Sequence, residues 1–427
     1  MLRIIEASDR RAVASLLSAS RTRDPATERR AARIVSDVRQ GGDEALAGYA
    51  RRLDGLKGPI EIPRDEIRAM AATVPRPVRA ALRDAARHIR AVARRQLPRG
   101  WRLQVAPGVS VQQRVTPLDS VGCYVPGGRY PLPSSLLMTA VPAKAAGVRN
   151  VVVACSRPEP AVLAAAVEAG VSRVFRMGGA QAIAAMAYGT ATVPRVDKIV
   201  GPGNRFVAAA KAFVASDCGI DFYAGPTEIV IVATKGPAAW IAADLVAQAE
   251  HDPDARAVLI TTSRPLAAKV ARAVDAQIPD SGPARESLAT HGGIIVAENI
   301  ASAMALANEA APEHLVVESE QLVKMARCAG SIFVGPWSAQ VAGDYAIGSN
   351  HVLPTAGTAR VRGGLSAADF VRQVTIQRLT RVGLRRIGPT AITLATSEGL
   401  VAHAASVAIR MAESKPGAEI RGPRRTR

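Results

Sequence analysis

The sequence predicts an α/β protein with two parallel-sheet lobes, a helical N-terminal region and a C-terminal helical extension. Short apolar runs, typical of buried strands, alternate with segments whose apolar residues recur at helical spacing. This alternation predicts parallel strands with helices on both faces of each sheet. A length of 427 residues exceeds what one hydrophobic core usually serves, which favours two lobes.

The first hundred residues are expected to be mostly helical. Residues 29–49 and 78–97 carry apolar side chains at helical spacing, with charged side chains on the opposite face. Gly41 and Gly42 predict a break in the first segment, and Pro75 and Pro77 mark the start of the second.

Two series of alternating strands and helices follow. In the first, strands are expected at residues 121–125, 151–154, 174–175 and 198–200, with helices at 134–147 and 161–170. In the second, strands are expected at 228–233, 257–262, 293–296, 315–317 and 331–334, with helices at 238–250 and 265–278. Residues 367–411 read as helical with a strand-like break at 390–394.

These elements predict four parts of the chain, with a hinge at Gly225 and Pro226. The parts are a helical arm (1–22), a first α/β lobe (23–123 with 227–365), a second α/β lobe (124–226) and a C-terminal helical extension with a basic tail (366–427).

The formal net charge of +19 raises the question of an acidic partner such as nucleic acid. Part of the excess is arginine near the two chain ends, at positions 29, 30, 33, 421, 424, 425 and 427. Aromatic residues make up only 4%, so the stacking platforms of single-strand binders are scarce, and no nucleic-acid-binding motif is present. We therefore favour a solubilising basic surface over nucleic-acid binding.

The cysteines and apolar runs indicate a cytoplasmic protein. Cys123, Cys155, Cys218 and Cys328 are far apart and form no CxxC pair, which suits a reducing compartment. The N-terminus becomes charged at once and lacks a signal-peptide core. No apolar run is long enough to cross a bilayer, so we expect no membrane association.

Two pairs of polar residues, each with one histidine, are candidate metal-binding or catalytic residues. Gln248 and His251, three residues apart at the end of a helix, can share one face and one metal ion, although such pairs are more often solvated surface residues. Glu313 and His314 lie at the amino end of a strand and form a plausible acid/base pair. On that fragment alone, a surface cap is the simpler interpretation.

A glycine-punctuated loop at residues 343–355 carries Asp344, Asn350 and His351, which a hydrophobic core does not need. Such loops often hold a ligand or metal, and a solvated loop is the alternative. Glu398 and His403 lie five residues apart on the C-terminal helix. His88 and His291 have no such setting and are expected to be surface or structural residues.

The glycine fingerprint of dinucleotide-binding folds is absent. Residues 201–206, with the sequence GPGNRF, follow a strand and open a helix, but Phe206 occupies the last glycine position. The lobes are therefore expected to be Rossmann-like but incomplete. The residues alone support an α/β enzyme with a candidate His/Asp metal site.

Taken together, the motifs resemble those of the histidinol dehydrogenase family over nearly the whole chain. The matching segments are YVPGG (124–128), PSS (133–135), GGAQAIA (178–184), GPGN (201–204), AGPTE (224–228), QAEH (248–251), APEH (311–314), the 343–355 loop, and EGL (398–400) before His403. So many matches in order make chance resemblance implausible.

The resemblance implies a role for each matching residue. One zinc ion per subunit would be held by Gln248, His251, Asp344 and His403, which also surround the substrate. Glu313 and His314 would be the acid/base pair, with His314 also contacting the substrate. Further implied roles are substrate contacts for Thr227, His351 and Glu398, and NAD contacts for Tyr124, Gln181 and Asn204.

The resemblance also implies the reaction and the assembly. L-histidinol would be oxidised to L-histidine by two NAD in succession, through an enzyme-held histidinaldehyde, in the last step of histidine biosynthesis. The family forms a homodimer in which the C-terminal segment crosses to the other subunit. Glu398 and His403 would then complete the partner's site.

One departure and one rival follow from the comparison of motifs. Thr227 stands where many relatives have serine, and the hydroxyl group is retained. A paralogous dehydrogenase acting on another diol, such as a sulfonated propanediol, is the alternative. His351 and Glu398 favour a substrate with imidazole and amine groups, because a carboxylate attracts a cation.

Overall fold

The computed structural model describes residues 2–17, 24–128, 130–223 and 225–412. The chain forms two compact units, the first of Met1–Leu97 with Leu118–Phe370 and the second of Pro98–Pro117 with Val371–Arg427. Part of the expected arm, Ala224 beside the expected hinge, and the basic tail from residue 413 lie outside the described residues. None of the described helices is both long and apolar enough to span a membrane.

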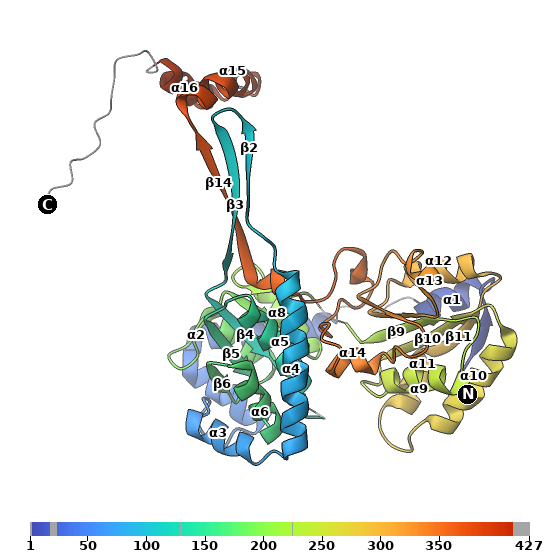
Figure 1. Cartoon of the computed structure of the whole chain (residues 1–427). Helices are drawn as coiled ribbons and strands as arrows, with labels where there is room; N and C mark the ends of the chain where they lie inside the picture. Colours follow the sequence, from blue (N-terminus) through green and yellow to red (C-terminus); the bar gives the residue numbers. More distant parts are fainter. Residues whose placement is uncertain (1, 18–23, 129, 224, 413–427) are drawn as a thin grey trace. The chain divides into compact units, whose positions relative to one another are not determined.

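The first unit contains a five-stranded parallel sheet with the order β6-β5-β4-β7-β8 (Figure 1). Its strands are β4 (Ser120–Tyr124), β5 (Asn150–Ala154), β6 (Arg173–Phe175), β7 (Lys198–Val200) and β8 (Gly219–Ile220). They are joined by α5 (Pro133–Ala145), α6 (Pro160–Ala169), α7 (Gly179–Tyr188) and α8 (Arg205–Val214). If the strands of this sheet are numbered along the chain, their order is 3-2-1-4-5, which matches the first five strands of the dinucleotide-binding sheet.

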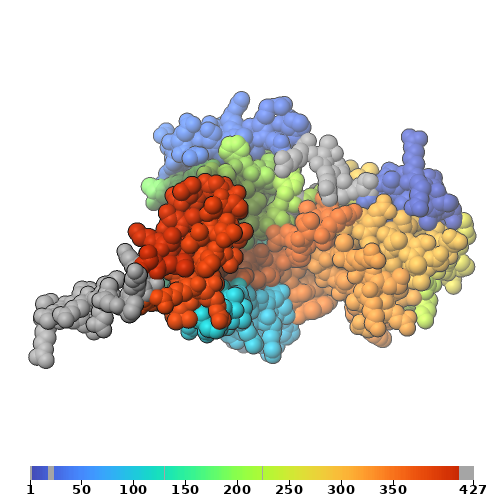
Figure 2. All heavy atoms as spheres, turned by 90° about the horizontal axis from the view of Figure 1, so that it is seen from above, coloured from blue at the N-terminus to red at the C-terminus, as the bar shows by residue number. Residues whose placement is uncertain are grey.

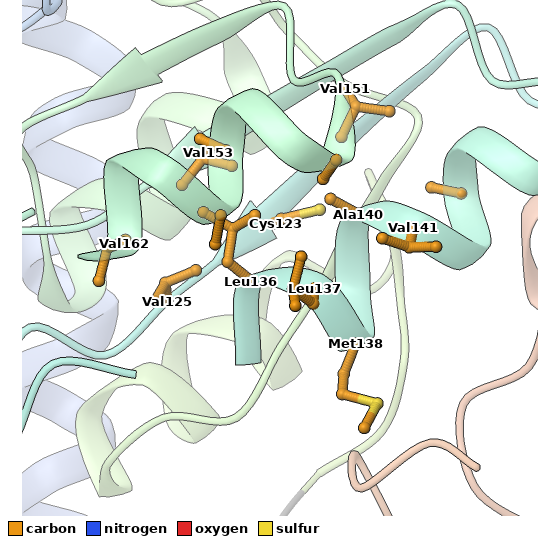
Figure 3. Close-up of a cluster of buried hydrophobic side chains, with 14 of the residues drawn as sticks. Cys123, Val125, Leu136, Leu137, Met138, Ala140, Val141, Val151, Val153 and Val162 are labelled. Carbon is orange, nitrogen blue, oxygen red and sulfur yellow. The ribbon is translucent and has the colours of Figure 1, made fainter. Parts of the chain in front are cut away.

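The core of this lobe accounts for its unbroken apolar strands. β4 and β5 are covered on both faces, so their side chains are buried without alternation. Figure 3 shows Cys123 and Val125 close to Leu136 and Leu137 of α5. Helices α5 and α6 pack on one face, and α7 and α8 on the other.

The N-terminal helices form an outer layer on this sheet. They are α2 (Pro25–Tyr49), the π-helix η1 (Ala50–Asp54), α3 (Arg64–Ala72) and α4 (Arg76–Gln96). The predicted break in the first helix is confirmed at Gly42, whose φ of 54° is left-handed. Helix α2 packs on α7 and α8, while α3 and α4 pack on α5 and α6.

This packing corrects the predicted grouping of residues 23–123 with 227–365. Residues 25–96 and β4 belong with the five-stranded sheet instead. An amphipathic helix shows which of its faces is buried, but its sequence does not specify which of two sheets will cover that face.

The same unit holds a six-stranded parallel sheet with the order β1-β11-β10-β9-β12-β13. The strands are β1 (Ile4–Glu6), β9 (Glu228–Val232), β10 (Arg256–Thr261), β11 (Gly292–Val296), β12 (His314–Val317) and β13 (Ser331–Val334). Its helices are α1 (Arg10–Leu17), α9 (Ala238–Ala249), α10 (Arg264–Gln277), α11 (Ala284–His291), α12 (Ile300–Ala310), α13 (Glu320–Val323) and α14 (Val341–Tyr345). The last five strands repeat the order 3-2-1-4-5.

Both parallel sheets confirm the predicted α/β class. The expected helical arm is wrong in part, because β1 adds an edge strand to the sheet before α1 begins. Three residues are too few to show a strand period in the sequence.

The second unit is a three-stranded antiparallel sheet followed by two helices (Figure 1). Its strands are β2 (Trp101–Ala106), β3 (Val109–Pro117) and β14 (Val371–Leu379), and its helices are α15 (Arg381–Ser397) and α16 (Val401–Ala412). Helices α15 and α16 pack on each other, and Figure 2 shows this C-terminal part of the chain in red. The prediction of helix over 367–411 is confirmed for residues 381–397 and 401–411 and wrong for residues 371–379, which are strand. The predicted break at 390–394 is wrong, because α15 runs through these residues.

A buried ion pair fixes the turn after β7. The Lys211 ammonium contacts the Asp221 carboxylate, and the side chains are 3% and 1% exposed. Lys211 Nζ also donates to the Gly201 carbonyl at 3.0 Å, and the Gly201 N–H donates to Asp221 Oδ2 at 2.8 Å. Gly201 has φ of 122°, and a side chain there would collide with the Tyr124 carbonyl. The ion pair therefore ties Gly201, the first residue of the turn after β7, to α8 and to the segment after β8.

We predict that Lys211→Met lowers the free energy of unfolding by about 3–5 kcal/mol, because it leaves the Asp221 carboxylate buried and unpaired. Urea denaturation followed by circular dichroism measures the change. The matched control is Lys235→Met, at an exposed position, which should change stability by less than about 0.5 kcal/mol. Equal stability of the two variants would contradict a structural role for the pair.

Candidate active site

The predicted acid/base pair lies at the amino ends of two adjacent strands of the six-stranded sheet, β9 and β12. His314 is the first residue of β12, and Glu313 precedes it. β12 pairs with β9 in parallel, with His314 opposite Ile229, so Thr227 and Glu228 lie beside the pair. In open α/β sheets ligands usually bind at the opposite, carboxyl edge. The cluster is therefore an unusual use of this edge.

Glu313 is held by a chain of hydrogen bonds. The Thr227 hydroxyl donates to Glu313 Oε2, and the Glu228 N–H donates to the same oxygen at 3.0 Å. The side-chain amide of Gln248 donates to Thr227 Oγ1 at 2.6 Å. Burial raises the pKa of Glu313 well above its ordinary value, although these donors oppose the rise. A carboxyl group whose pKa is raised in this way can serve as a general acid or base.

His314 has one ring nitrogen engaged and one free. Its Nδ1 lies 3.2 Å from the Glu228 carbonyl oxygen, which can only accept, so we assign the proton to Nδ1. Nε2 is buried and has no hydrogen-bond partner among the described residues. Burial lowers the pKa of His314 to about 3, with further lowering by His251 and His351. The ring is therefore neutral and offers Nε2 as a proton acceptor.

Asp344, in the glycine-punctuated segment, faces this nitrogen, and His351 of the same segment lies beside Asp344. Asp344 Oδ1 lies 3.9 Å from His314 Nε2, and Gln340 Nε2 donates to Asp344 Oδ2 at 3.1 Å. Burial raises the pKa of Asp344 to about 6. His351 Nδ1 lies 3.0 Å from the Asp344 carbonyl, and its Nε2 lies 3.4 Å from Ser135 Oγ. The predicted ligand-binding interpretation of this loop is thus compatible with its position.

Gln248 and His251 approach from the end of α9. Gln248 is fully buried, and its Oε1 has no hydrogen-bond partner among the described residues. His251 is solvent-exposed, yet the surrounding protein lowers its pKa by desolvation. Its charge would interact with those of His314 and His351, so the three imidazoles belong to one cluster.

Two of the predicted substrate and metal residues, Glu398 and His403, belong to the second unit. Glu398 is the C-cap residue of α15, and His403 lies on α16, both exposed and both in the second unit. Within the described ranges, no three side chains of His, Cys, Asp or Glu lie close enough together to hold a metal ion. One unit therefore brings together Thr227, Gln248, His251, Glu313, His314, Asp344 and His351, and leaves out Glu398 and His403.

The predicted cofactor residues lie around the five-stranded sheet. Tyr124 ends β4, and Asn204 caps α8 after β7, so both follow the two strands where the strand order reverses. Ligands of such sheets bind outside the carboxyl ends of these strands. The Gly179 N–H donates to the Tyr124 hydroxyl at 3.1 Å, and Gln181 lies two residues further along α7. Gln181 Oε1 is buried and lacks a hydrogen-bond partner in the described part of the chain.

The sequence interpretation missed Asp54. Its Oδ2 accepts hydrogen bonds from the Gly178 N–H at 3.0 Å and from Gln181 Nε2 at 2.9 Å. Asp54 is separated from these partners by more than 120 residues and stands in an ordinary polar stretch. No local signal in the sequence identifies it.

The fold and the buried imidazole–carboxylate cluster define an α/β enzyme. The family model described as Histidinol dehydrogenase matches residues 17–411. Proteins named histidinol dehydrogenase from Methanothermobacter thermautotrophicus and Agrobacterium fabrum are 47% and 48% identical, each over 88% of this chain and over 92% and 91% of their own lengths. The crystal structure of histidinol dehydrogenase from Elizabethkingia anophelis superposes with a TM-score of 0.92 at 32% identity, covering 96% of this chain and 98% of that one.

The chain therefore belongs to the histidinol dehydrogenase family, as its motifs predicted, and is an oxidoreductase.

We predict that Thr227→Val lowers the free energy of unfolding by about 1–3 kcal/mol, because valine keeps the shape but removes the hydroxyl between Glu313 and Gln248. Thr227→Ser keeps that hydroxyl and serves as the control. Thermal and urea denaturation of both variants measure the difference. If the valine and serine variants had the same free energy of unfolding, the Thr227 hydroxyl would not contribute to the stability of the cluster.

Proposed function

We propose that this chain is a zinc-dependent, NAD-linked histidinol dehydrogenase that oxidises L-histidinol to L-histidine, in the last step of histidine biosynthesis. Family membership supports the reaction class. The single observation that carries the proposal is the unpartnered Nε2 of His314, a neutral base buried beside Glu313. A dehydrogenase needs such a base to accept the proton of the alcohol.

Zinc would be held by Gln248, His251, Asp344 and His403. The unpartnered Oε1 of Gln248 supports this ligand set, because a buried amide oxygen costs free energy unless a donor or cation satisfies it. Nitrogen and oxygen donors of these kinds suit zinc. When bound, the ion orients the amine and imidazole nitrogens of the substrate and polarises its hydroxyl group.

The protein's own groups then account for the proton transfers. His314 accepts the hydroxyl proton at Nε2 while a hydride leaves the carbinol carbon for the NAD co-substrate, giving an aldehyde. Glu313 takes a proton from water as it adds to the aldehyde carbon, while His314 returns its proton to the aldehyde oxygen, which gives the hydrate. The freed Nε2 of His314 then accepts a hydroxyl proton of the hydrate during the second hydride transfer. The buried setting of both residues keeps bulk water from the reactive amino aldehyde.

The NAD co-substrate would be bound by Tyr124, Gln181 and Asn204. The position of Tyr124 and Asn204 at the carboxyl ends of β4 and β7 supports this, as does the unpartnered Oε1 of Gln181. Substrate recognition is assigned to Thr227, His351 and Glu398. The carboxylate of Glu398 suits the cationic amine of histidinol.

A homodimer with exchanged C-terminal segments is part of the proposal. Helix α16 buries none of its residues, and Val382, Val401 and Ile409 are 64%, 75% and 58% exposed in the single chain. A second copy would cover such apolar positions. The same exchange would bring Glu398 and His403 to the partner's cluster. We place the enzyme in the cytoplasm, where free cysteines such as Cys123 and Cys155 persist.

The reaction is tested by counting NADH formed per L-histidinol consumed by the zinc-loaded protein. We expect two NADH per substrate, because a four-electron oxidation reduces two NAD. His314→Ala should lower kcat by at least about a hundredfold, since it removes the proton acceptor. A folded, zinc-loaded protein that leaves histidinol unchanged would refute the proposal and direct attention to other diols.

The exchange is tested by complementation between His314→Ala and His403→Ala, each inactive alone. Coexpression should restore about a quarter of the wild-type activity, because half of the dimers are mixed and each has one intact site. If each subunit used its own His403, the mixture would have no intact site. Complete absence of activity in a mixture shown to contain mixed dimers would therefore contradict the exchange.

A further inference from the structure

The Asp54 carboxylate is placed where a bound dinucleotide would meet it. Both of its hydrogen bonds to the protein end on Oδ2, from the Gly178 N–H and Gln181 Nε2. Oδ1 has no hydrogen-bond partner among the described residues and is not among their fully buried, unsatisfied atoms. Oδ2 therefore holds the start of α7 in place, and Oδ1 is available to a ligand.

The order of the strands indicates which part of a bound dinucleotide would lie beside Asp54. Gly178 follows β6, and a Cβ atom built on it would lie 2.9 Å from Asp54 Oδ1 and 2.9 Å from Ser156 Cβ, in the loop after β5. The carboxylate thus contacts the loop after the third strand of a 3-2-1-4-5 sheet and lies near the loop after the second. In dinucleotide-binding sheets of this order, the adenosine half lies over the ends of these strands.

The residues directly after β5 lack the acidic side chain that usually contacts the ribose at this strand end. In such folds an Asp or Glu near this strand end binds the ribose 2′-hydroxyl, whereas an arginine accommodates a 2′-phosphate. Here Ser156 and the exposed Arg157 follow the strand end, and the carboxylate of this loop, Glu159, stands five residues beyond the strand at the N-cap of α6. Asp54 brings a carboxylate to the same place from η1, outside the sheet. Burial raises the pKa of Asp54, and Arg157 is close enough to oppose that rise.

We propose that Asp54 determines the coenzyme specificity of this site: its Oδ1 accepts the ribose 2′-hydroxyl of NAD and repels the 2′-phosphate of NADP, which Arg157 would otherwise attract. The inference rests on the proposed NAD-linked function. It explains how the chain selects NAD although the strand end itself carries the arginine typical of NADP sites.

Asp54→Asn separates this role from a structural one. The asparagine retains a carbonyl oxygen that can accept from Gly178 and Gln181, and it removes the negative charge. Asp65→Asn, at an exposed position on α3, is the control for the same charge change elsewhere. Asp54→Asn combined with Arg157→Ala tests whether the arginine supplies the attraction for phosphate.

The measurement is calorimetric binding of ADP-ribose and 2′-phospho-ADP-ribose to the zinc-loaded full chain, which needs no turnover. The wild type and Asp65→Asn should bind ADP-ribose at least about tenfold more tightly than 2′-phospho-ADP-ribose. Asp54→Asn should shift the ratio of the two dissociation constants toward the phosphorylated probe by about tenfold or more, and adding Arg157→Ala should cancel that shift. The ratio kcat/KM for NADP over NAD should rise in parallel.

The outcomes distinguish the inference from its foundation. If the wild type binds neither probe, the cofactor site of the proposed function is wrong, and the inference falls with it. If ADP-ribose binds and Asp54→Asn weakens both probes equally, Asp54 only positions the loop and the inference alone is overturned. Should Asp54→Asn fail to fold, Arg157→Glu decides: binding of the phosphorylated probe must fall at least about tenfold relative to ADP-ribose, and an unchanged ratio overturns the proposal.

Discussion

The parallel pairing of β9 with β12 is the constraint on which the candidate site depends. It places Thr227 and Glu228 beside Glu313 and His314, although more than 80 residues separate the two segments. The same pairing lets the Glu228 carbonyl fix the tautomer of His314. A one-residue slip in register would turn these side chains to the other face of the sheet. The rigid sheet, more than any loop, therefore sets the geometry.

Burial at this edge then sets the chemistry. The same desolvation raises the pKa values of Glu313 and Asp344 and lowers that of His314. Carboxyl groups are shifted toward the protonated form and imidazoles toward the neutral form, relative to the same groups in water. A cation in the cluster would favour the carboxylate form of Asp344. The same argument applies to metal and to a cationic substrate, both of which the proposed reaction requires.

Much of the fold follows from the sequence, and the failures have physical causes. Both series of buried strands were predicted because their apolar runs are unbroken, and the helix break at Gly42 because glycine tolerates positive φ. β14 escaped prediction because mostly exposed residues, such as Gln373 and Arg378, cover both faces and leave no apolar period. Which sheet covers α2, and how Asp54 reaches the loop before α7, depend on tertiary contacts that no local pattern encodes. The spacing of the site residues is typical of exposed surface pairs, so it does not identify them as a site. Only the resemblance of their motifs to those of the histidinol dehydrogenase family groups them together.

The most direct test of the account is zinc-edge anomalous diffraction from crystals of the full chain grown with zinc and L-histidinol. The account predicts one anomalous peak per subunit, bonded to Gln248, His251 and Asp344 and to the partner subunit's His403, with the substrate hydroxyl facing His314. A peak away from these residues, or histidinol bound elsewhere, would contradict it.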